Sequence, residues 1–553
     1  MKLYRAIATV GSFTLISRVL GFARDILIAA GLGSGPIADA FFVAFRFPNL
    51  FRRWFGEGAF NAAFVPLYAK RLEGEGEASA SGFAGEASAG LTFILLLLSG
   101  AAIFAMPWLM AGLAPGFVGN ESQYDFAVLL TQITVPYLIC MSLVALMSGV
   151  LNSHGRYAAA AAAPILLNVI LIGAVAGVML FGGGGGDGTA DATVALRGEI
   201  NVAFALAIGV AFAGLAQLLM LVIALRRSGI AVPSRVPVWN ADMKRLVTLG
   251  VPGLIAGGIT QINIVVGTII ASLQAGAISY LYYADRLYQL PLGIVGIAIG
   301  VVLLPDIARL LRAGDTAGAL DTQNRALEFA LMLTIPAAIG LALAADPILS
   351  VLFERGAFDA EAREKTALAL QAFAVGLPAF VLIKVFQPAF FAREDTATPM
   401  RYAGYNLVTN VVLSLALFFG IHQATGPDAG LGYVGIAIAT SVAGWVNAWL
   451  LWRRLGQDGA YRADAGLRRA IPIIFAAAVV MGLALVAGLI GLAPWLAPEA
   501  GLAVRAAALA LAIGGPGLVY FAILHLARVF RVSDLRRARS AEPDGGDRPS
   551  GLV

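Results

Sequence analysis

Long apolar segments separated by short polar ones follow one another through almost the whole chain. A helix that crosses the hydrocarbon core of a bilayer needs roughly 20 mostly apolar residues. Fourteen segments meet that requirement, near residues 8–31, 37–56, 83–107, 124–151, 158–181, 201–225, 247–272, 278–304, 326–345, 367–391, 400–421, 431–452, 470–492 and 502–527. The pattern predicts an all-α, polytopic membrane protein with about 14 transmembrane helices.

Composition agrees with this fold class. Of the 553 residues, 59% are hydrophobic and 13% are charged, whereas about 25% charged residues is usual in soluble domains. A soluble globular enzyme is therefore excluded. The net charge of +5 fits basic cytoplasmic loops and a basic tail after Arg528 that anchors at the membrane surface, so no nucleic-acid partner is expected.

The distribution of basic residues predicts the orientation. With the N-terminus in the cytoplasm and fourteen spans, 28 of the 38 lysines and arginines fall in cytoplasmic segments and 5 in external ones. Cytoplasmic loops of membrane proteins are enriched in these residues. The bias predicts that both termini are cytoplasmic.

The residues that hold metals, cofactors or catalytic nucleophiles are scarce. The single cysteine, Cys140, excludes a disulfide framework, a thiolate zinc site and an iron–sulfur cluster. The three histidines are far apart in sequence, and no Ser/His/Asp triad or nucleotide-binding motif is visible. We expect no metal, no cofactor and no enzymatic activity.

Two parts of the chain repeat weakly at an offset near 240 residues. Arg286 follows Arg46 by 240 residues, and the Pro-x-x-Ala-basic pattern at 66–70 recurs at 305–309. Asn168 is likewise followed by Asn410 at 242. Six predicted helices separate the copies, and an even number gives a parallel repeat. The repeat predicts two six-helix lobes (1–230 and 231–460), two additional helices (461–530) and a basic cytoplasmic tail (531–553).

Charged residues inside the predicted spans are the main candidates for a functional site. Each costs about 2.5–3.5 kcal/mol at mid-membrane on insertion scales, so it normally faces a partner or a wet cavity. They are Arg18, Arg24, Asp25, Asp39, Arg46, Asp285, Arg286 and Lys384. Five cations and three acids leave a positive excess, which favours an anionic ligand because guanidinium groups bind phosphate oxygens in pairs.

Helical spacing predicts how these charges are arranged. Arg18 and Asp25 are seven residues apart and should share a face, with Arg24 turned away from that pair. In the second span, a stripe of residues seven apart contains Asp39, Arg46 and Arg53, and Asn49 and Glu57 extend it. Pro48 should kink or break this helix. The alternative to an anion site is a set of interhelical salt bridges, such as Arg18–Asp25 or Asp285–Arg286.

Two further polar groups allow more than one interpretation. The cluster of Tyr280, Tyr282, Tyr283 and Tyr288 could stack on sugars, or could form an interfacial belt or pack between lobes. Asn406, Asn410 and Thr440 could form a cation site with Gln261 or Asn263, but interhelical hydrogen bonding is favoured.

Several blocks of sequence resemble the MurJ (MviN) lipid II flippase family. The blocks are Ser17-Arg18-Val19-Leu20-Gly21-Phe22-Ala23-Arg24-Asp25, Asp39-Ala40-Phe41-Phe42-Val43-Ala44-Phe45, Pro48-Asn49-Leu50-Phe51-Arg52-Arg53, Glu57-Gly58-Ala59-Phe60 with Ala63-Phe64-Val65-Pro66, and Tyr282-Tyr283-Ala284-Asp285-Arg286-Leu287. The resemblance extends over essentially the whole chain. It implies a fourteen-helix transporter of the bacterial inner membrane that moves undecaprenyl-pyrophosphate-linked peptidoglycan precursor, lipid II, to the periplasmic leaflet.

The resemblance also implies roles for individual residues. The substrate-binding charges would be Arg18, Arg24, Asp39, Arg52 and Arg286, of which Arg24, Arg52 and Arg286 would bind the pyrophosphate. Supporting or gating residues would be Asp25, Arg46, Asn49, Arg53, Glu57, Asp285 and Lys384. The two additional helices would hold the polyprenyl tail.

Two positions depart from the family pattern. Gln289 stands where some members have an acid, and Asn410 supplies an amide where sodium-binding members use a carboxylate. We therefore expect no sodium coupling. The resembled family belongs to the multidrug/oligosaccharidyl-lipid/polysaccharide exporter superfamily. Alternatives are therefore an exporter of another polyprenyl-linked glycan or a multidrug exporter of that superfamily. A membrane glycosyltransferase is a further alternative, which the short external loops disfavour. The sequence leaves open the energy source, the oligomeric state and any contacts with cell-wall synthesis and division proteins.

Overall fold

The computed structural model describes residues 2–52, 60–181, 192–426 and 429–530. Regular structure in these ranges is helical, apart from an isolated bridge between Arg355 and Phe358. The predicted all-α fold class is therefore confirmed. Arg53, Glu57 and the predicted tail at 531–553 lie outside the described residues.

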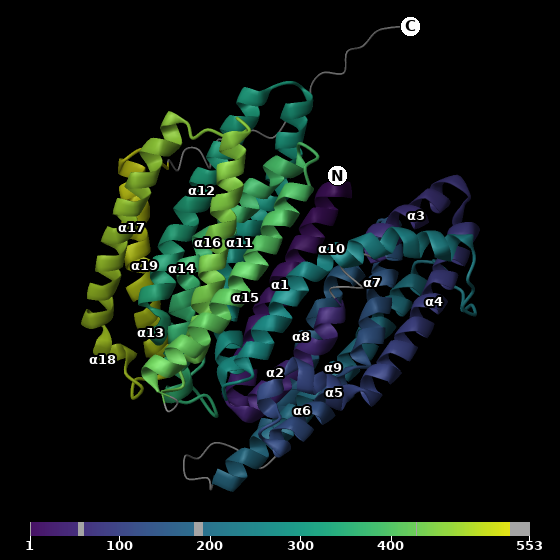
Figure 1. Ribbon diagram of the computed structural model, residues 1–553, viewed down its shortest axis with the longest axis horizontal. Helices are drawn as coiled ribbons and strands as arrows, with labels where there is room; N and C mark the ends of the chain where they lie inside the picture. Colours follow the sequence, from purple (N-terminus) through teal and green to yellow (C-terminus); the bar gives the residue numbers. More distant parts are fainter. Residues whose placement is uncertain (1, 53–59, 182–191, 427–428, 531–553) are drawn as a thin grey trace. The chain divides into compact units, whose positions relative to one another are not determined.

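The predicted spans of the first half all overlap helices of the structure, which also contains α3 outside any predicted span (Figure 1). The helices of this half are α1 (Lys2–Leu32), α2 (Pro36–Arg52), α3 (Phe60–Gly74), α4 (Glu77–Phe104), α5 (Met106–Leu113), the 3₁₀ turn η2 (Pro115–Phe117), α6 (Glu121–Thr134), α7 (Tyr137–Ser153), α8 (Tyr157–Phe181), α9 (Ala192–Arg227) and α10 (Ala241–Ala271).

The second half continues in the same way. It contains α11 (Ala277–Arg312), α12 (Thr316–Leu343), α13 (Ala345–Leu352), α14 (Ala360–Phe391), α15 (Ala397–Thr425), α16 (Gly432–Gln457), α17 (Ala465–Gly491), α18 (Ala493–Leu496) and α19 (Leu502–Leu526).

Within the described residues, ten helical segments are long and apolar enough to cross a membrane. The other four predicted spans coincide with α1, α2, α10 and α11. Three of these helices, α1, α2 and α11, contain seven of the eight predicted intramembrane charges. The helices that least resemble transmembrane segments by composition are thus the ones that contain the candidate site.

Prolines affect two of the predicted spans differently. The span predicted at 124–151 is divided into α6 and α7 at Val135 and Pro136, where proline has no N–H to donate to the preceding turn. In α2, by contrast, the helix continues through Pro48 as far as Arg52. A complete break at Pro48 is therefore not observed.

Contacts divide the chain into two compact units. Unit 1 contains residues 1–287, 352–373 and 400–443, and unit 2 contains residues 288–351, 374–399 and 444–553. In unit 1, α8 packs against both α1 and α9, and α2 packs against α6. These units are contact groups, so the predicted repeat of two six-helix lobes stays a prediction.

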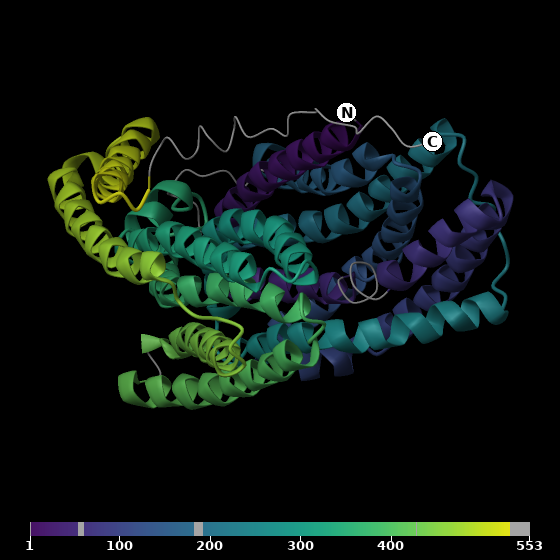
Figure 2. The same ribbon diagram turned by 90° about the horizontal axis from the view of Figure 1, so that it is seen from above.

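In unit 2, the two C-terminal helices pack together and against α12. Their shared core includes Ile335, Ile474 and Met481, and the Tyr520 hydroxyl donates a hydrogen bond of 2.8 Å to the carbonyl oxygen of Met332. The pair α17 and α19, yellow-green to yellow in Figures 1 and 2, is therefore attached to the chain through α12.

A close backbone contact fixes the turn between α1 and α2 in unit 1. Gly33 (φ +60°) and Gly356 (φ +59°) lie against Ala357 and Ala30, at distances that leave no room for a side chain. Ala357 N–H also donates to the carbonyl oxygen of Ala30, at 2.8 Å. This contact holds the end of α1 and the start of α2, the two helices that contribute most of the candidate charges.

Candidate functional site: an arginine cluster in unit 1

The carboxylate of Asp25 lies between two arginines. Arg24 Nη2 is 2.7 Å from Asp25 Oδ1, and Arg286 Nε is 3.3 Å from Asp25 Oδ2. Arg24 and Asp25 are 6% and 3% exposed, whereas the Arg286 side chain is 31% exposed. Asp25 therefore shares its single negative charge between a buried cation and one that is open on one side. We call Arg24, Asp25 and Arg286 the charge cluster.

Two neutral side chains complete the hydrogen bonding of the charge cluster. Asn168 on α8 accepts from Arg24 Nη1 at 2.9 Å and donates to the carbonyl oxygen of Ser17 at 2.9 Å. The Tyr282 hydroxyl accepts from Arg286 Nη2 at 3.0 Å and donates to Asp25 Oδ1 at 3.2 Å. Because α1 packs along α8, Asn168 fixes the Arg24 guanidinium in place.

A third arginine lies beside the same tyrosine. Arg46 Nη1 donates to Thr268 Oγ1 on α10 at 3.0 Å, and its guanidinium lies 5.9 Å from the Tyr282 ring centroid. The Arg286 guanidinium lies 4.6 Å from the same centroid, within cation–π range. Phe42 stacks on that ring at 4.0 Å. Tyr282 thus positions two arginines, one on α2 and one on α11.

The charged groups around Tyr282 are matched in number. Three arginines, Arg24, Arg46 and Arg286, lie with three acids, Asp25, Asp39 and Asp285; Arg46 interacts electrostatically with Asp285 and Asp39, and Arg286 with Asp25 and Asp285. Desolvated guanidinium groups need anionic or hydrogen-bonding partners, and they bind phosphate oxygens bidentately. The arrangement can accept a further anion on the exposed side of Arg286.

Asp39 does not join the charge cluster. Its fully buried carboxylate accepts hydrogen bonds from the backbone N–H of Gly276 at 2.7 Å and of Ser279 at 2.8 Å. These N–H groups lie at the start of α11, where a helix leaves donors unpaired and carries partial positive charge. Asp39 therefore caps α11 from α2, and these contacts favour a structural role over substrate binding.

The remaining predicted residues have no described contact with the charge cluster. Arg18 is exposed on α1, and Asn49 donates to the carbonyl oxygen of Phe45 on its own helix. Arg52 is the last residue of α2. Lys384 belongs to unit 2, where its side-chain carbons pack against Gly296.

The orientation expected for Arg24 on α1 is wrong. The seven-residue spacing predicted Arg18 and Asp25 on one face with Arg24 turned away, but Arg24 pairs with Asp25. Adjacent residues point about 100° apart on a helix, and a long arginine side chain can bridge that angle. The helical positions of the Cα atoms therefore do not determine where a guanidinium group ends.

Sequence reasoning did not assign a role to three residues of this region. Asn168 was visible only as part of the repeat. Tyr282 appeared in a block that resembles the family and as one of four tyrosines, all of which are at most 6% exposed, but it was given no contact with the arginines. Thr268 had no signal at all. The available signal for Tyr282 was its position four residues before Arg286, because residues four apart are neighbours on a helix.

Asn410 of unit 1 forms hydrogen bonds between helices, as favoured by the sequence. Its Nδ2 donates to Asn263 Oδ1 of α10 at 2.7 Å, and its Oδ1 accepts from the Thr440 hydroxyl of α16 at 3.3 Å. Ser414, one turn further along α15, donates to the same oxygen at 3.3 Å. Among the described residues, no group of three or more His, Cys, Asp or Glu side chains could hold a metal ion.

Sequence comparisons identify close relatives of the chain. A family model described as lipid II flippase MurJ matches residues 28–506. A probable lipid II flippase MurJ from Rhizobium meliloti (strain 1021) is 46% identical over 524 residues, which are 95% of this chain and 94% of the relative. A probable lipid II flippase MurJ from Rickettsia prowazekii (strain Madrid E) is 34% identical and covers 85% of this chain and 87% of its own length.

Solved structures share the fold. A lipid II flippase MurJ in an inward closed conformation matches with a TM-score of 0.73 at 24% identity, over 96% of this chain and 99% of that one. An inward-facing multidrug resistance MATE family transporter of the MOP superfamily matches with a TM-score of 0.62 at 15% identity, over 82% and 98%.

Fold and site together define a class. The chain is a multi-pass, all-helical membrane protein with the fold of the MOP transporters and an arginine-rich polar cluster among its helices. The match over residues 28–506 and the extensive identity to the relatives identify the family. This chain belongs to the MurJ family.

Proposed function

We propose that this protein moves lipid II from the cytoplasmic to the periplasmic leaflet of the bacterial inner membrane by alternating access. Family membership supports this cargo, since the family model and the relatives are described as lipid II flippases. The protein transports without a catalytic step. The basic-residue bias supports a cytoplasmic location for both termini.

One observation carries the proposal: a single buried carboxylate, Asp25, is shared by Arg24 and Arg286. Lipid II has a diphosphate between its polyprenyl tail and its sugars. Moving that anion into hydrocarbon without compensation is strongly unfavourable. Two guanidinium groups held in place by Asn168 and Tyr282 would replace the lost water.

Asp25 would act as an internal substitute for the diphosphate. In the absence of cargo it would pair with both arginines and offset one of their two positive charges, and cargo would take over their donors as it binds. A ligand shifts a conformational equilibrium only by its differential affinity for the two states. Return of the arginines to Asp25 in the other state would therefore weaken cargo binding and promote release.

Other predicted residues would act around this centre. Arg52 would provide a third diphosphate contact, and Arg18 would attract the headgroup from the exposed face of α1. The supporting residues would balance the charge of the site or line the openings on its two sides. They are Asp285, Lys384, Arg46, Asn49, Arg53 and Glu57. The two lobes would rock about the site, and α17 and α19 would hold the polyprenyl tail along their exposed apolar side chains, such as Leu483 and Leu518.

Complementation tests this proposal. Cells depleted of their own lipid II flippase would express the wild-type chain or Arg24→Ala, Arg286→Ala or Arg309→Ala variants at matched abundance. Arg309 is an exposed basic residue of unit 2 and serves as the control. Growth and lipid II in the outer leaflet would both be measured.

The proposal expects rescue by wild type and by Arg309→Ala, and failure of the two cluster variants. Rescue by all variants would remove the cluster from the transport site while leaving the cargo in place. Failure of a well-expressed wild-type chain would contradict lipid II as the cargo and favour another polyprenyl-linked glycan.

A further inference from the structure

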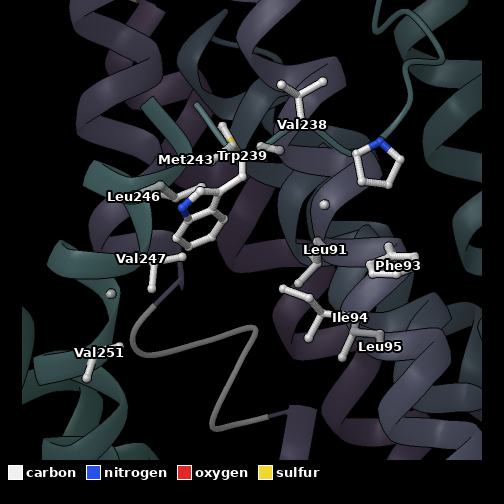
Figure 3. A pocket seen from close by; sticks show the side chains of 14 residues that line it. Leu91, Phe93, Ile94, Leu95, Val238, Trp239, Met243, Leu246, Val247 and Val251 are labelled. Atoms are coloured by element: carbon white, nitrogen blue, oxygen red, sulfur yellow. The ribbon is translucent and has the colours of Figure 1, made fainter. Parts of the chain in front are cut away.

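An apolar cavity in unit 1 lies apart from the charge cluster. It has a volume of about 490 Å³ and is bounded by α4, by the segment between α9 and α10, and by the first turns of α10. Figure 3 shows Leu91 and Ile94 of α4 on one side of the cavity and Met243 and Leu246 of α10 on the other. Trp239 lies beside Met243 and Leu246.

A second cavity adjoins the apolar one and is more polar. Its volume is about 670 Å³, and it shares Phe93 and Pro237 with the first. Arg226 and Arg235 line it, together with Ser88 and Thr92 of α4 and Ser234. Both volumes lie within the range of about 300–1,000 Å³ that is typical of small-molecule pockets. The two cavities together offer an apolar compartment next to a cationic one.

The segment 228–240 is held firmly across α4. The carbonyl oxygen of Pro233 lies so close to Gly85 that a Cβ there would meet it at 2.4 Å. Glu86 accepts from Arg235 Nη1 at 2.8 Å and from Asn240 Nδ2 at 2.8 Å. Since Asn240 also caps α10 through Met243 N–H, the walls of both cavities are positioned by specific contacts.

The same segment exposes large apolar side chains. Val236 is 74% exposed and Trp239 is 69% exposed, although Trp239 also borders the apolar cavity. Tryptophan is enriched at the boundary between the hydrocarbon and the headgroups of a bilayer. Lys244 and Arg245 follow in the first turns of α10. The segment thus combines apolar contact with several positive charges at one end of α4, α9 and α10.

We propose that these cavities bind an anionic phospholipid of the surrounding bilayer. One acyl chain lies in the apolar cavity between α4 and α10, and the phosphate lies in the adjoining cavity between Arg226 and Arg235. Ser88, Thr92 and Ser234 supply hydroxyls for the remaining phosphate and glycerol oxygens. The occupant is a resident lipid that joins α4 to the segment 228–240, and it is distinct from the transported cargo.

Charge complementarity and connectivity favour this occupant. A zwitterionic phospholipid carries a cationic group that two arginines repel, whereas phosphatidylglycerol presents a phosphate and neutral hydroxyls. Guanidinium groups bind phosphate through paired hydrogen bonds. The shared boundary at Phe93 and Pro237 lets one molecule occupy both cavities.

Native mass spectrometry of the purified full-length chain tests the proposal, with dioleoyl phosphatidylglycerol as the probe and dioleoyl phosphatidylcholine as the reference lipid. The headgroup variant is Arg226→Gln with Arg235→Gln. The chain variant is Gly90→Phe, which fills the apolar cavity from a helix position where a Cβ meets nothing within 4 Å. Gly100→Phe, also on α4 with open space at its Cβ, is the matched control.

Two further variants separate lipid binding from other effects. Glu86→Gln removes the salt bridge of Arg235 but keeps its cation, so it reports any purely structural role of that bridge. Arg309→Gln with Arg312→Gln removes two exposed basic residues of α11 in unit 2 and reports general surface charge.

The proposal expects wild type to prefer phosphatidylglycerol, and the headgroup and chain variants each to bind it about tenfold more weakly. Gly100→Phe and the Arg309/Arg312 double variant should bind it like wild type, and Glu86→Gln, which frees Arg235 from its carboxylate partner, should bind it at least as tightly. Equal affinity in all variants would overturn the proposal, as would equal loss in Glu86→Gln or in the Arg309/Arg312 variant. Displacement of phosphatidylglycerol by equimolar undecaprenyl phosphate would instead assign the cavities to the polyprenyl cargo. None of these readouts depends on transport.

Discussion

Two contacts in unit 1 fall at positions that the predicted sequence repeat makes equivalent, but they differ in charge. In the first, Arg24 of α1 donates to Asn168 of α8. In the second, Asn410 of α15 donates to Asn263 of α10. Asn263 follows Arg24 by 239 residues, and Asn410 follows Asn168 by 242. Under the predicted repeat, α1 with α8 and α10 with α15 are equivalent helix pairs, and an asparagine joins each pair, once to an arginine and once to an amide.

The difference between these two contacts distinguishes a structural requirement from a functional one. An interhelical amide pair is sufficient to join two helices, as Asn263 and Asn410 do. At the corresponding position, a buried arginine adds the desolvation of a full charge, which is a weak source of stability. We therefore propose that the charge of Arg24, with Asp25 beside it, serves to bind an anion rather than to pack two helices.

The largest effect is expected from removing the charged side chain of Arg24, which contacts Asn168. Arg24→Ala should reduce the appearance of lipid II in the outer leaflet by about 10- to 100-fold, because a charge-assisted contact to the diphosphate is lost. Arg24→Lys keeps the charge but not the planar fork and should retain part of the activity. Lipid II accessible to an externally added enzyme would be measured in depleted cells. Equal activity of Arg24→Ala and wild type would contradict the assignment.

Neutralising the shared carboxylate should affect binding and turnover in opposite directions. Asp25→Asn leaves Arg24 and Arg286 without their internal anion, so lipid II should bind about tenfold more tightly. Turnover should fall, because no carboxylate then competes for the arginines during release. Binding and transport would be measured on the same purified protein in vesicles. Unchanged affinity would argue that Asp25 is not a substitute for the diphosphate.

Asp39 should affect stability more than transport. Asp39→Ala removes the acceptor for two N–H groups at the start of α11 and should lower the free energy of unfolding by about 1–2 kcal/mol. Asp39→Asn, which keeps one acceptor oxygen, should lose less. Thermal unfolding in detergent measures this effect, and transport per folded molecule should stay close to wild type. Loss of transport in a fully stable Asp39→Asn protein would return Asp39 to the substrate site that the sequence predicts.

The smallest effect is expected at the uncharged contact between Asn263 and Asn410. Asn263→Ala should lower stability by about 0.6 kcal/mol, the average for interhelical hydrogen bonds in membranes, and leave transport unchanged. Replacing sodium with choline at constant ionic strength should not alter the melting temperature of wild type. A sodium-dependent rise that disappears in Asn263→Ala would show that the amide group binds a cation.

Hydropathy was sufficient to predict the long helices, because a bilayer imposes one length and one composition on nearly every span, but it did not predict α3 or the short helices such as α5. Hydropathy indicates α1, α2 and α11 less clearly, because charged residues of the candidate site interrupt their apolar sequence. Charges among apolar residues identified Arg24, Asp25 and Arg286 as candidates, because their burial requires a partner or a cavity.

The partners themselves were not predictable from the sequence. Asp39 binds backbone groups 237 and 240 residues away, and nothing in a single sequence marks which helix start a carboxylate will reach. The pairing of Arg24 with Asp25 depends on the path of a flexible side chain, which spacing does not encode. The i, i+4 spacing indicates that Tyr282 can reach Arg286, but its contacts with Asp25 of α1 and Arg46 of α2 required the structure.

The most direct test of the central claim measures binding of the diphosphate by the charge cluster. Purified wild type, Arg24→Ala and Asn263→Ala would be titrated with lipid II and with an analogue in which the diphosphate is replaced by a monophosphate. The account predicts that wild type and Asn263→Ala prefer the diphosphate by about tenfold, and that Arg24→Ala loses this preference. The same preference in all three proteins would contradict it.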